Sequence, residues 1–204
     1  MTTLSLLETI AAIFGVLSVV LARFAHIGVF PTGLVSTLLY IYICFGAGLY
    51  ADMGINVWYS LLSVYGWWRW LQPKAGMEER SVSWSSRPLR LLSVVLMLAA
   101  WALLYFLLRA FTDSNVPLAD AFTTAVALVG MYLMAEKKLE NWLAWLVVDV
   151  VSVGLYAYKG LYVSSLQFAV FTALAWWGWL GWKRLAQSER ATMHDPYSKA
   201  QSGS

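Results

Sequence analysis

Residues 91–108 read LLSVVLMLAAWALLYFLL, eighteen consecutive positions without a charged side chain. A helix needs about 20 apolar residues to cross the hydrocarbon core of a bilayer, so this run can span a membrane once. Six further charge-poor runs surround it, at 9–22, 27–51, 53–68, 121–135, 141–158 and 160–182. None of them shows the short alternating pattern of a membrane-spanning strand. The sequence therefore predicts an all-α integral membrane protein with seven transmembrane helices.

The composition excludes several other classes of protein. The chain has 204 residues, of which 60% are hydrophobic and 12% charged, whereas a soluble domain carries about 25% charged residues. The net charge of +3 is better explained by basic residues that orient the chain in a bilayer than by a nucleic-acid-binding surface, so we set nucleic-acid binding aside. The single cysteine, Cys44, excludes an internal disulfide and a cysteine-rich metal site. The first run lacks a preceding basic residue and a cleavage pattern, so we expect a retained helix rather than a signal peptide.

The basic residues are distributed unequally between the two sides of the membrane. Seven crossings place twelve of the 14 Lys and Arg residues on the side of the C-terminus and leave only Arg109 and Lys159 on the other. The positive-inside rule makes the first side cytoplasmic and the N-terminus external. Residues 73–88 are expected to form a soluble connection. Residues 186–204, rich in Ser, Gln and charge, are expected to form a disordered cytoplasmic tail.

Part of the sequence recurs at an offset of 112 positions. The offset superposes Gly48, Leu49, Tyr50, Leu62, Gly66, Trp67 and Trp70 on Gly160, Leu161, Tyr162, Leu174, Gly178, Trp179 and Trp182. We interpret these runs as copies, although such residues also punctuate ordinary aromatic belts. Two three-helix repeats share one orientation only if a single helix separates them. We therefore expect parallel repeats at 1–72 and 111–185, joined over 73–110 by a connection and a linker helix, with a substrate site where they meet.

Asp149 lies in the middle of a membrane run, beneath two tryptophans. Steps of three and four residues place Trp142, Trp145 and Asp149 on one helical face. At about 1.5 Å per residue, Asp149 lies about 12 Å beyond Asn141, near the middle of a core about 30 Å thick. An aspartate there costs about 2.5 to 3.5 kcal/mol and normally faces a cavity or a partner. Since no Lys or Arg lies at that depth, a ligand cation or a proton must balance the charge.

This face predicts a pocket for a flat, positively charged ring. Indoles attract cations and stack on heteroaromatic rings. Alternatively, Trp142 could be an interfacial anchor, and Asp149 could make a structural hydrogen bond to Tyr40 or Tyr42. The deep amides Gln167 and Asn56 suit recognition of hydroxyl groups, although either could instead join two helices. Ser36, Thr37, Thr124 and Ser152 are expected to bond back to their own helices, and Pro31 and Gly33 to mark a kinked or closely packed helix start.

These residues together resemble the PnuC family of bacterial vitamin transporters. The resemblance covers roughly residues 8–184 and rests on five segments: YIY at 40–42, GLYAD at 48–52, YGWWRW at 65–70, ENWLAW at 140–145 followed by Asp149, and YKGLY at 158–162. It implies a fold of two fused SWEET-type bundles in the bacterial inner membrane. It also implies facilitated uptake of nicotinamide riboside, with metabolic trapping by phosphorylation. Trp142, Trp145 and Asp149 would contact the substrate, and Gln167 falls where relatives place a polar residue.

One departure from the family leaves the substrate open. Many nicotinamide riboside members carry Gln-Trp where this chain has Met131-Tyr132, so an amide near the pocket is lost. Thiamine, which is also a flat cation with a hydroxyl group, is the alternative. Riboflavin is larger and uncharged, and Asp149 argues against it. The partners expected are therefore a vitamin and the lipid bilayer, without a cofactor, and a homo-oligomer is left open.

Two other classes of function remain as alternatives. An intramembrane enzyme would need a catalytic group that the chain does not offer, because His26 and His194 lie in a connection and in the tail and no HExxH motif occurs. No GxxxxGK[ST] motif suggests energy coupling by nucleotide hydrolysis. A purely structural membrane protein would not explain a carboxylate at mid-depth. For a transporter, we expect Gly66 and Gly178 to be equivalent packing contacts of two moving bundles, so that leucine at either slows transport but spares binding.

Overall fold

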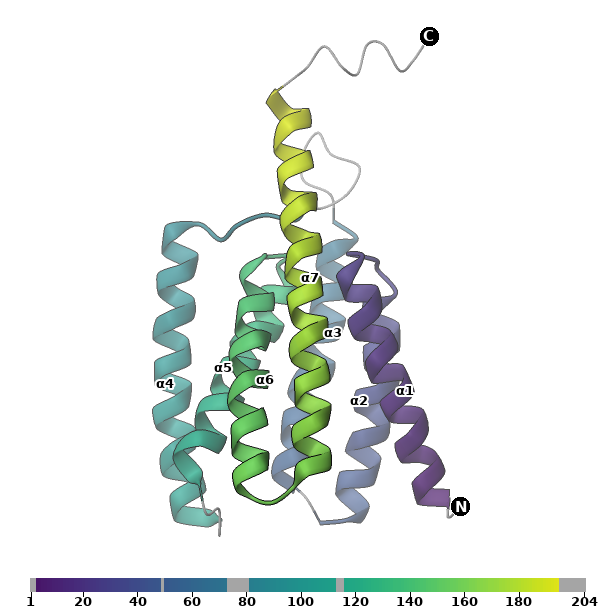
Figure 1. Cartoon of the computed structure of the whole chain (residues 1–204), viewed down its shortest axis with the longest axis vertical. Helices are drawn as coiled ribbons and strands as arrows, with labels where there is room; N and C mark the ends of the chain where they lie inside the picture. The colour runs from purple at the N-terminus through teal and green to yellow at the C-terminus, as the bar shows by residue number, and fades with distance from the viewer. Residues whose placement is uncertain (1–2, 49, 73–80, 113–115, 195–204) are drawn as a thin grey trace.

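The computed structural model describes residues 3–48, 50–72, 81–112 and 116–194, and the chain there is all-α, as predicted. Its helices are α1 (Thr3–Arg23), α2 (Val29–Gly46), α3 (Tyr50–Trp70), α4 (Arg87–Phe111), α5 (Pro117–Ala135), α6 (Glu140–Tyr158) and α7 (Tyr162–His194). They stand side by side as a bundle (Figure 1). Within the described residues, α1, α2, α4, α5 and α6 are long and apolar enough to cross a membrane.

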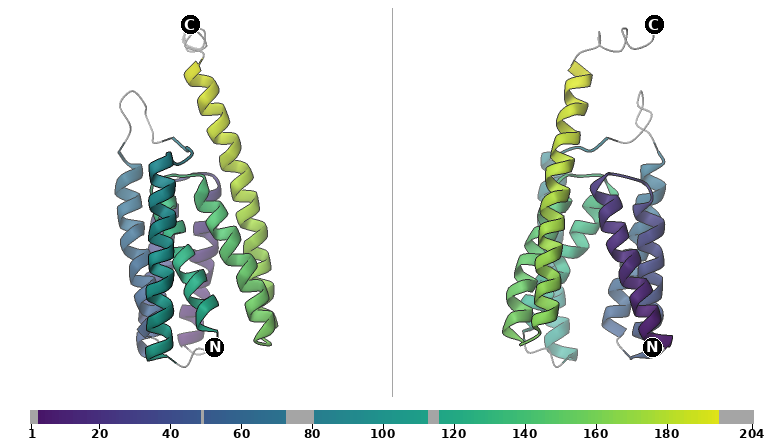
Figure 2. Two further views of the ribbon diagram at one scale, coloured as in Figure 1. Left: turned by 90° about the vertical axis from the view of Figure 1, so that its left-hand side faces the viewer. Right: turned by 45° about the vertical axis from the view of Figure 1, so that its right-hand side comes forward.

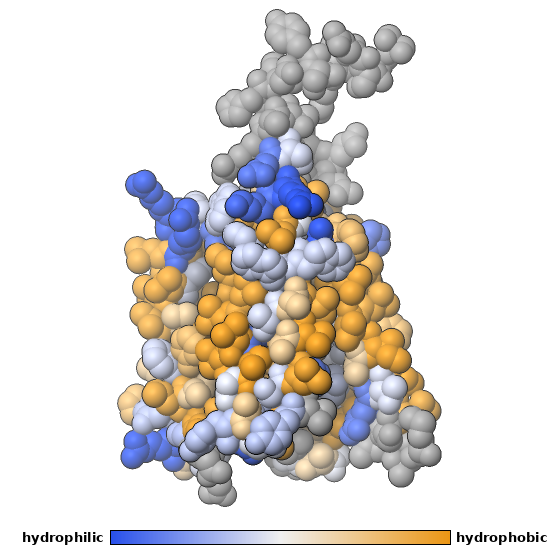
Figure 3. Space-filling view, in the orientation of Figure 1, coloured by the Kyte–Doolittle hydropathy of each residue, from blue (hydrophilic) through white to orange (hydrophobic). Residues whose placement is uncertain are grey.

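The surface of the bundle is suited to lipid rather than water. Leu91, Phe106 and Phe111 of α4 are 67%, 67% and 81% exposed, and an apolar belt crosses the middle of the face shown in Figure 3. Soluble proteins rarely expose contiguous apolar surface on this scale. One end, here called the basic end, carries the described cations Arg23, Arg69, Arg87, Arg90, Lys137, Lys138, Lys183 and Arg184. The helices therefore lie as a membrane bundle with one strongly basic rim.

The helices pack in two groups of three. Consecutive helices are in contact within α1–α3 and within α5–α7, and the groups meet where α3 packs on α5 and α1 packs on α7. α4 packs on α5 at the outside of the bundle (Figure 2). A space between the two groups is thus bordered by six helices, and α4 takes no part in it.

Several features of the backbone recur at the offset of 112 residues. α1 and α5 end at Arg23 and Ala135, α2 and α6 end at Gly46 and Tyr158, and α3 and α7 begin at Tyr50 and Tyr162. The turns recur as well. Gly48 and Gly160 have φ angles of 71° and 74°, and Ala25 and Lys137 have φ angles of 51° and 57°. These left-handed values are unusual outside glycine, so their recurrence is informative.

Two segments differ from the sequence-based expectation. In the connection expected to be soluble, Val82 is buried in the core, and Ser83 and Lys138 form an isolated β-bridge, so residues 81–86 pack against the α5–α6 turn. α7 continues to His194, so the part of the expected disordered tail from 186 to 194 is helical. Residues 73–80 of the connection and 195–204 of the tail lie outside the described residues.

Candidate functional site

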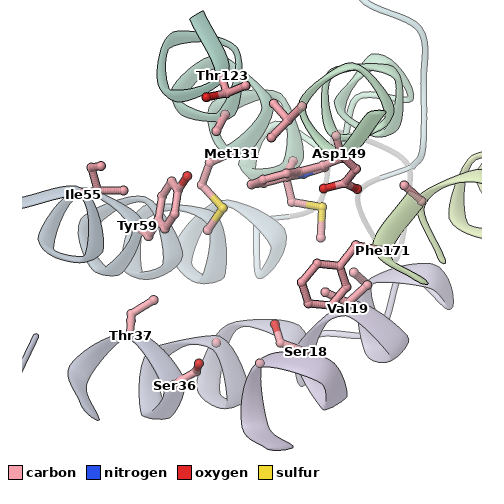
Figure 4. Close-up of a pocket in the computed structure, with 18 of the residues that line it drawn as sticks. Ser18, Val19, Ser36, Thr37, Ile55, Tyr59, Thr123, Met131, Asp149 and Phe171 are labelled. Carbon is pink, nitrogen blue, oxygen red and sulfur yellow. The ribbon is translucent and has the colours of Figure 1, made fainter. Parts of the chain in front are cut away.

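A cavity of about 490 Å³ lies between the two groups of helices. Its lining extends from Trp142, near the basic end, to Asp120 and Tyr156, near the opposite end. Side chains from α1 and α2 face those from α5 and α6 across the space in Figure 4, where Ser18, Ser36 and Thr37 lie opposite Thr123, Met131 and Asp149. The volume falls in the range of about 300 to 1,000 Å³ that small-molecule sites occupy.

Asp149 places a buried carboxyl group in this cavity. It is 5% exposed, and the close-up shows its carboxylate pointing into the cavity (Figure 4). No ion pair or hydrogen bond of the Asp149 side chain occurs among the described residues, and no Lys or Arg is among the residues that line the cavity. The other lining carboxylate, Asp120, lies 3.4 Å from Nζ of Lys159. Asp149 is therefore the lining carboxylate that a cationic ligand could neutralise.

The two tryptophans of the same helix face the cavity in different ways. Trp142 is buried, with its ring against Gly178 and edge-to-face to Trp182 at 5.8 Å, and its Nε1 has no hydrogen-bond partner among the described residues. Trp145 is half-buried and lies 6.4 Å from the ring of Tyr59 on α3. Trp142, Trp145 and Asp149 thus line one cavity from a single face of α6, as their spacing predicts.

The remaining candidate residues divide into two groups. Tyr40 and Asn56 line the cavity, although Asn56 Nδ2 also donates to the backbone oxygen of Asp52 at 2.9 Å. Gln167 is exposed and does not line the cavity, so the structure does not bring this amide to the site. Tyr42, considered as a partner of Asp149, is 66% exposed and also lies elsewhere.

Some of the small hydroxyl side chains form hydrogen bonds with partners other than those expected. Thr124 bonds back to Asp120 within its own helix, as expected, and Thr37 does so with Leu34 but also shares a 2.7 Å bond with Ser60 of α3. Ser36 instead donates to the backbone oxygen of Ala11 on α1 at 2.8 Å. The hydroxyl groups therefore tie α1, α2 and α3 together beside the cavity.

An aromatic cluster closes the cavity at the basic end. The cluster consists of four buried residues that follow one another in space in the order Phe30, Trp70, Trp182 and Trp142. Each ring meets the next edge-to-face or tilted, with centroids 4.9 to 6.1 Å apart. Two indole hydrogen bonds cross between the helix groups. Trp182 Nε1 of α7 donates to the oxygen of Ala22 on α1 at 2.7 Å, and Trp70 Nε1 of α3 donates to the oxygens of Met134 and Ala135 on α5 at 3.3 and 3.2 Å.

These two bonds are equivalent under the offset of 112, which superposes Trp70 on Trp182 and Ala22 on Met134. An ion pair between Arg69 Nε and Glu136 Oε1 at 3.0 Å adds a third link beside them. In this conformation the cavity is therefore closed toward the basic end.

A family model described as nicotinamide mononucleotide transporter matches residues 5–184. The chain belongs to the nicotinamide mononucleotide transporter family. The resemblance to PnuC is confirmed, since the nicotinamide riboside transporter PnuC of Escherichia coli (strain K12) is 28% identical, with 94% of this chain and 91% of that protein covered. The family consists of membrane transporters and not of enzymes.

Two further transporters are similar to this chain at comparable levels. The riboflavin/roseoflavin transporter RibM of Streptomyces davaonensis is 26% identical, with 86% of this chain and 83% of RibM covered. A crystal structure of the vitamin B3 transporter PnuC is 25% identical and superposes with a TM-score of 0.69, covering 90% of this chain and 83% of that one. The chain is thus similar to transporters named for different vitamins.

Several lining residues of this family member were not singled out from the sequence. They are Ser18, Tyr59, Asp120, Met134 and Phe171. Phe30, in contrast, is indicated by the repeat offset, which superposes Phe30 on Trp142, and likewise Gly33 on Trp145 and Thr37 on Asp149. Both members of each superposed pair line the cavity, but they carry different side chains and so contribute different chemistry to it. Tyr59 and Phe171 carried no comparable signal, since apolar helices are rich in aromatic residues throughout.

Proposed function

We propose that this protein mediates facilitated uptake of nicotinamide riboside across the bacterial inner membrane. The observation that carries the proposal is the buried carboxylate of Asp149, which has no ion pair among the described residues and lies beside two indoles in a cavity of suitable size. The pyridinium ring of nicotinamide riboside is flat and cationic, so it can pair with the carboxylate and stack on an indole. The names of the PnuC relatives support this substrate.

The proposed binding residues are Trp142, Trp145 and Asp149, with Tyr40 and Asn56 available to the ribose hydroxyls. Met131 lines the cavity where the resemblance places an amide in many family members, so thiamine remains the second candidate. RibM makes riboflavin a necessary comparison, although its uncharged ring would leave Asp149 without a counter-charge.

Uptake into proteoliposomes that contain only this protein tests the proposal. Labelled nicotinamide riboside is expected to equilibrate across the membrane without an added energy source, while riboflavin enters no faster than into protein-free liposomes. Accumulation above equilibrium is expected only when a kinase and ATP are enclosed to trap the product by phosphorylation. If neither nicotinamide riboside nor thiamine enters, although the protein is folded, it is not a transporter of cationic vitamins.

We further infer that the fold is a duplication, with two parallel three-helix repeats in α1–α3 and α5–α7 and α4 as the linker. The recurrent helix ends, φ angles and crossed indole bonds support this inference. Parallel repeats around one central site can rock against each other and expose the site alternately to the two sides. The basic end would be cytoplasmic and the N-terminus external, by the positive-inside rule.

The crossed indole bonds then act as a closure of the cytoplasmic end. Trp182→Phe keeps a ring in place but removes the donor to Ala22. Since a hydrogen bond contributes about 0.5 to 1.5 kcal/mol net, its loss should shift the equilibrium between the closed and the cytoplasm-open state about two- to tenfold toward the open state. The shift can be measured as faster labelling of Ala175→Cys, in a Cys44→Ser background, by a membrane-impermeant thiol reagent added from the cytoplasmic side.

Trp101→Phe is the matched control for this prediction. It removes the same kind of bond, from Nε1 to the oxygen of Leu118 at 3.1 Å, but between α4 and α5 and away from the junction of the two groups. The labelling rate is expected to stay unchanged in this variant. Equal acceleration in both variants would show that loss of any indole bond loosens the bundle, and the closure role would be abandoned.

A further inference from the structure

Arg23 lies at the junction of α1 and α7, outside the cavity. It is the last residue of α1, and its guanidinium carbon is 4.7 Å from the ring centroid of Trp177. The guanidinium also passes over Gly181, where a Cβ would collide with it. Trp177, Gly181 and Arg184 are spaced by four and three residues, so they form one stripe along α7. Arg23 of one helix group thus lies along this stripe of the other group.

The charges at this junction are unbalanced. Arg184 follows Gly181 by about one helical turn on the stripe that Arg23 contacts, and its positive charge opposes that of Arg23. The ion pairs between described side chains involve Arg69, Arg90 and Lys159, and neither Arg23 nor Arg184 takes part in one. Arg23 Nε is moreover buried and has no hydrogen-bond partner there. A pair of guanidinium groups in this state can bind an anion that offers several oxygen atoms, and phosphate fits their donor geometry.

The surroundings indicate where such a phosphate comes from. Phe24 and Trp177, whose ring centroids lie 5.3 and 4.7 Å from the guanidinium carbon of Arg23, are 58% and 41% exposed. The preceding residue along the chain, Trp176, is 52% exposed, and Lys183 Nζ lies 5.0 Å from the ring of Trp179. Arg23 ends an apolar span, so it lies at the level of the lipid headgroups. Figure 3 shows hydrophilic side chains gathered where α7 leaves the apolar belt. Exposed aromatic rings at that level contact lipid, which favours a phosphate carried by a lipid over a free one.

We propose that Arg23 and Arg184, framed by Phe24 and Trp177, bind the headgroup phosphate of an anionic phospholipid. The lipid would bridge α1 and α7 at the basic end and neutralise the repulsion between the two arginines. The repeat offset places Ala135 at the position equivalent to Arg23, so the second helix group has no copy of this site. One lipid of this kind is therefore expected per chain.

Native mass spectrometry of the full-length protein in detergent, with added phosphatidylglycerol or phosphatidylcholine, tests the proposal. The unmodified protein is expected to retain one phosphatidylglycerol at concentrations where phosphatidylcholine is lost. Arg23→Gln and Arg184→Gln should each weaken this retention about tenfold, because each removes a charged hydrogen-bond donor to the phosphate. Arg87→Gln is the matched control, since it removes an exposed positive charge from the same end but on α4.

Two outcomes would overturn the proposal. Equal losses of phosphatidylglycerol in all three variants would indicate attraction by the whole basic end rather than a site. Stabilisation against heat by millimolar inorganic phosphate, equal to that by phosphatidylglycerol and lost in Arg184→Gln, would assign the site to a free anion. Because the Arg184 side chain is exposed, its replacement tests the site even if Arg23→Gln fails to fold.

Discussion

Asp149→Asn is expected to weaken the binding of nicotinamide riboside about tenfold to a hundredfold, the range that corresponds to a hydrogen bond with a charged group of about 1.5 to 3 kcal/mol. Asparagine keeps the size and one oxygen of the side chain but removes the charge that balances the pyridinium ring. The reduced form, dihydronicotinamide riboside, has nearly the same shape and an uncharged ring. Its binding should change by less than about threefold, since it gains little from the charge. Titration calorimetry with both ligands measures the difference.

Asp120→Asn is the control for this prediction. It removes a carboxylate that also lines the cavity, but one whose side chain is 30% exposed and already close to Lys159. Solvent screens such a charge, so the affinity for the cation should change little. If Asp149→Asn weakens both ligands equally, the carboxylate only positions the helix or accepts hydrogen bonds, and the case for a cationic substrate loses its main support.

The sequence predicts the helices well because membrane spans follow a simple rule. Each backbone polar group must be satisfied inside the lipid, so a charge-poor run of sufficient length has to be helical. Asp149 could be found for a similar reason, since a carboxylate at mid-depth is costly unless it faces a cavity. Trp142 and Trp145 follow from Asp149 by helical spacing alone. These three residues required no knowledge of how the helices pack.

Gln167 shows where this reasoning fails. Phe168, Phe171 and Ala175 of α7 line the cavity at spacings of three and four residues, and Gln167 lies one position away, on a face that is exposed. The rotation of α7 about its axis is set by its packing on α6 and α1, which the sequence of an apolar helix does not reveal. The helical continuation of α7 to His194 was missed for a different reason, because its polar composition is also typical of disorder.

The two repeat-related glycines face equivalent rings but differ in their further neighbours. A Cβ on Gly66 would lie 2.5 Å from the ring of Phe30 and 3.1 Å from the backbone of Ala135, which belongs to the other helix group. A Cβ on Gly178 would lie 2.5 Å from the ring of Trp142. Gly66 therefore fits the expected contact between moving groups. For Gly178, the expectation that substitution spares binding is replaced, because this glycine supports Trp142, which is a proposed binding residue, whereas Phe30 lines the cavity without being one.

Gly178→Ala is accordingly expected to lower substrate affinity and transport rate together. Since the Cβ and the Trp142 ring cannot both keep their places, the ring must shift. Overpacking of a core costs about 1 to 3 kcal/mol, which corresponds to a loss of affinity of about five- to 150-fold if the bound state alone carries this cost. Gly66→Ala, which obstructs Phe30 and the contact with α5, should lower the transport rate more than the affinity. Parallel measurements of equilibrium binding and initial uptake rate separate the two effects.

Gly154→Ala on α6 supplies the control for both glycine variants. A Cβ there has no atom within 4 Å apart from its own helix, so the substitution adds the same methyl group without a collision. Alanine also favours the helix slightly over glycine, which means that stability should be equal or higher. Binding and uptake are expected to stay as in the unmodified protein. Unchanged affinity in Gly178→Ala, with normal folding, would mean that Trp142 can move without loss of substrate contact, and Trp142 would then be an element of the closed end rather than part of the binding site.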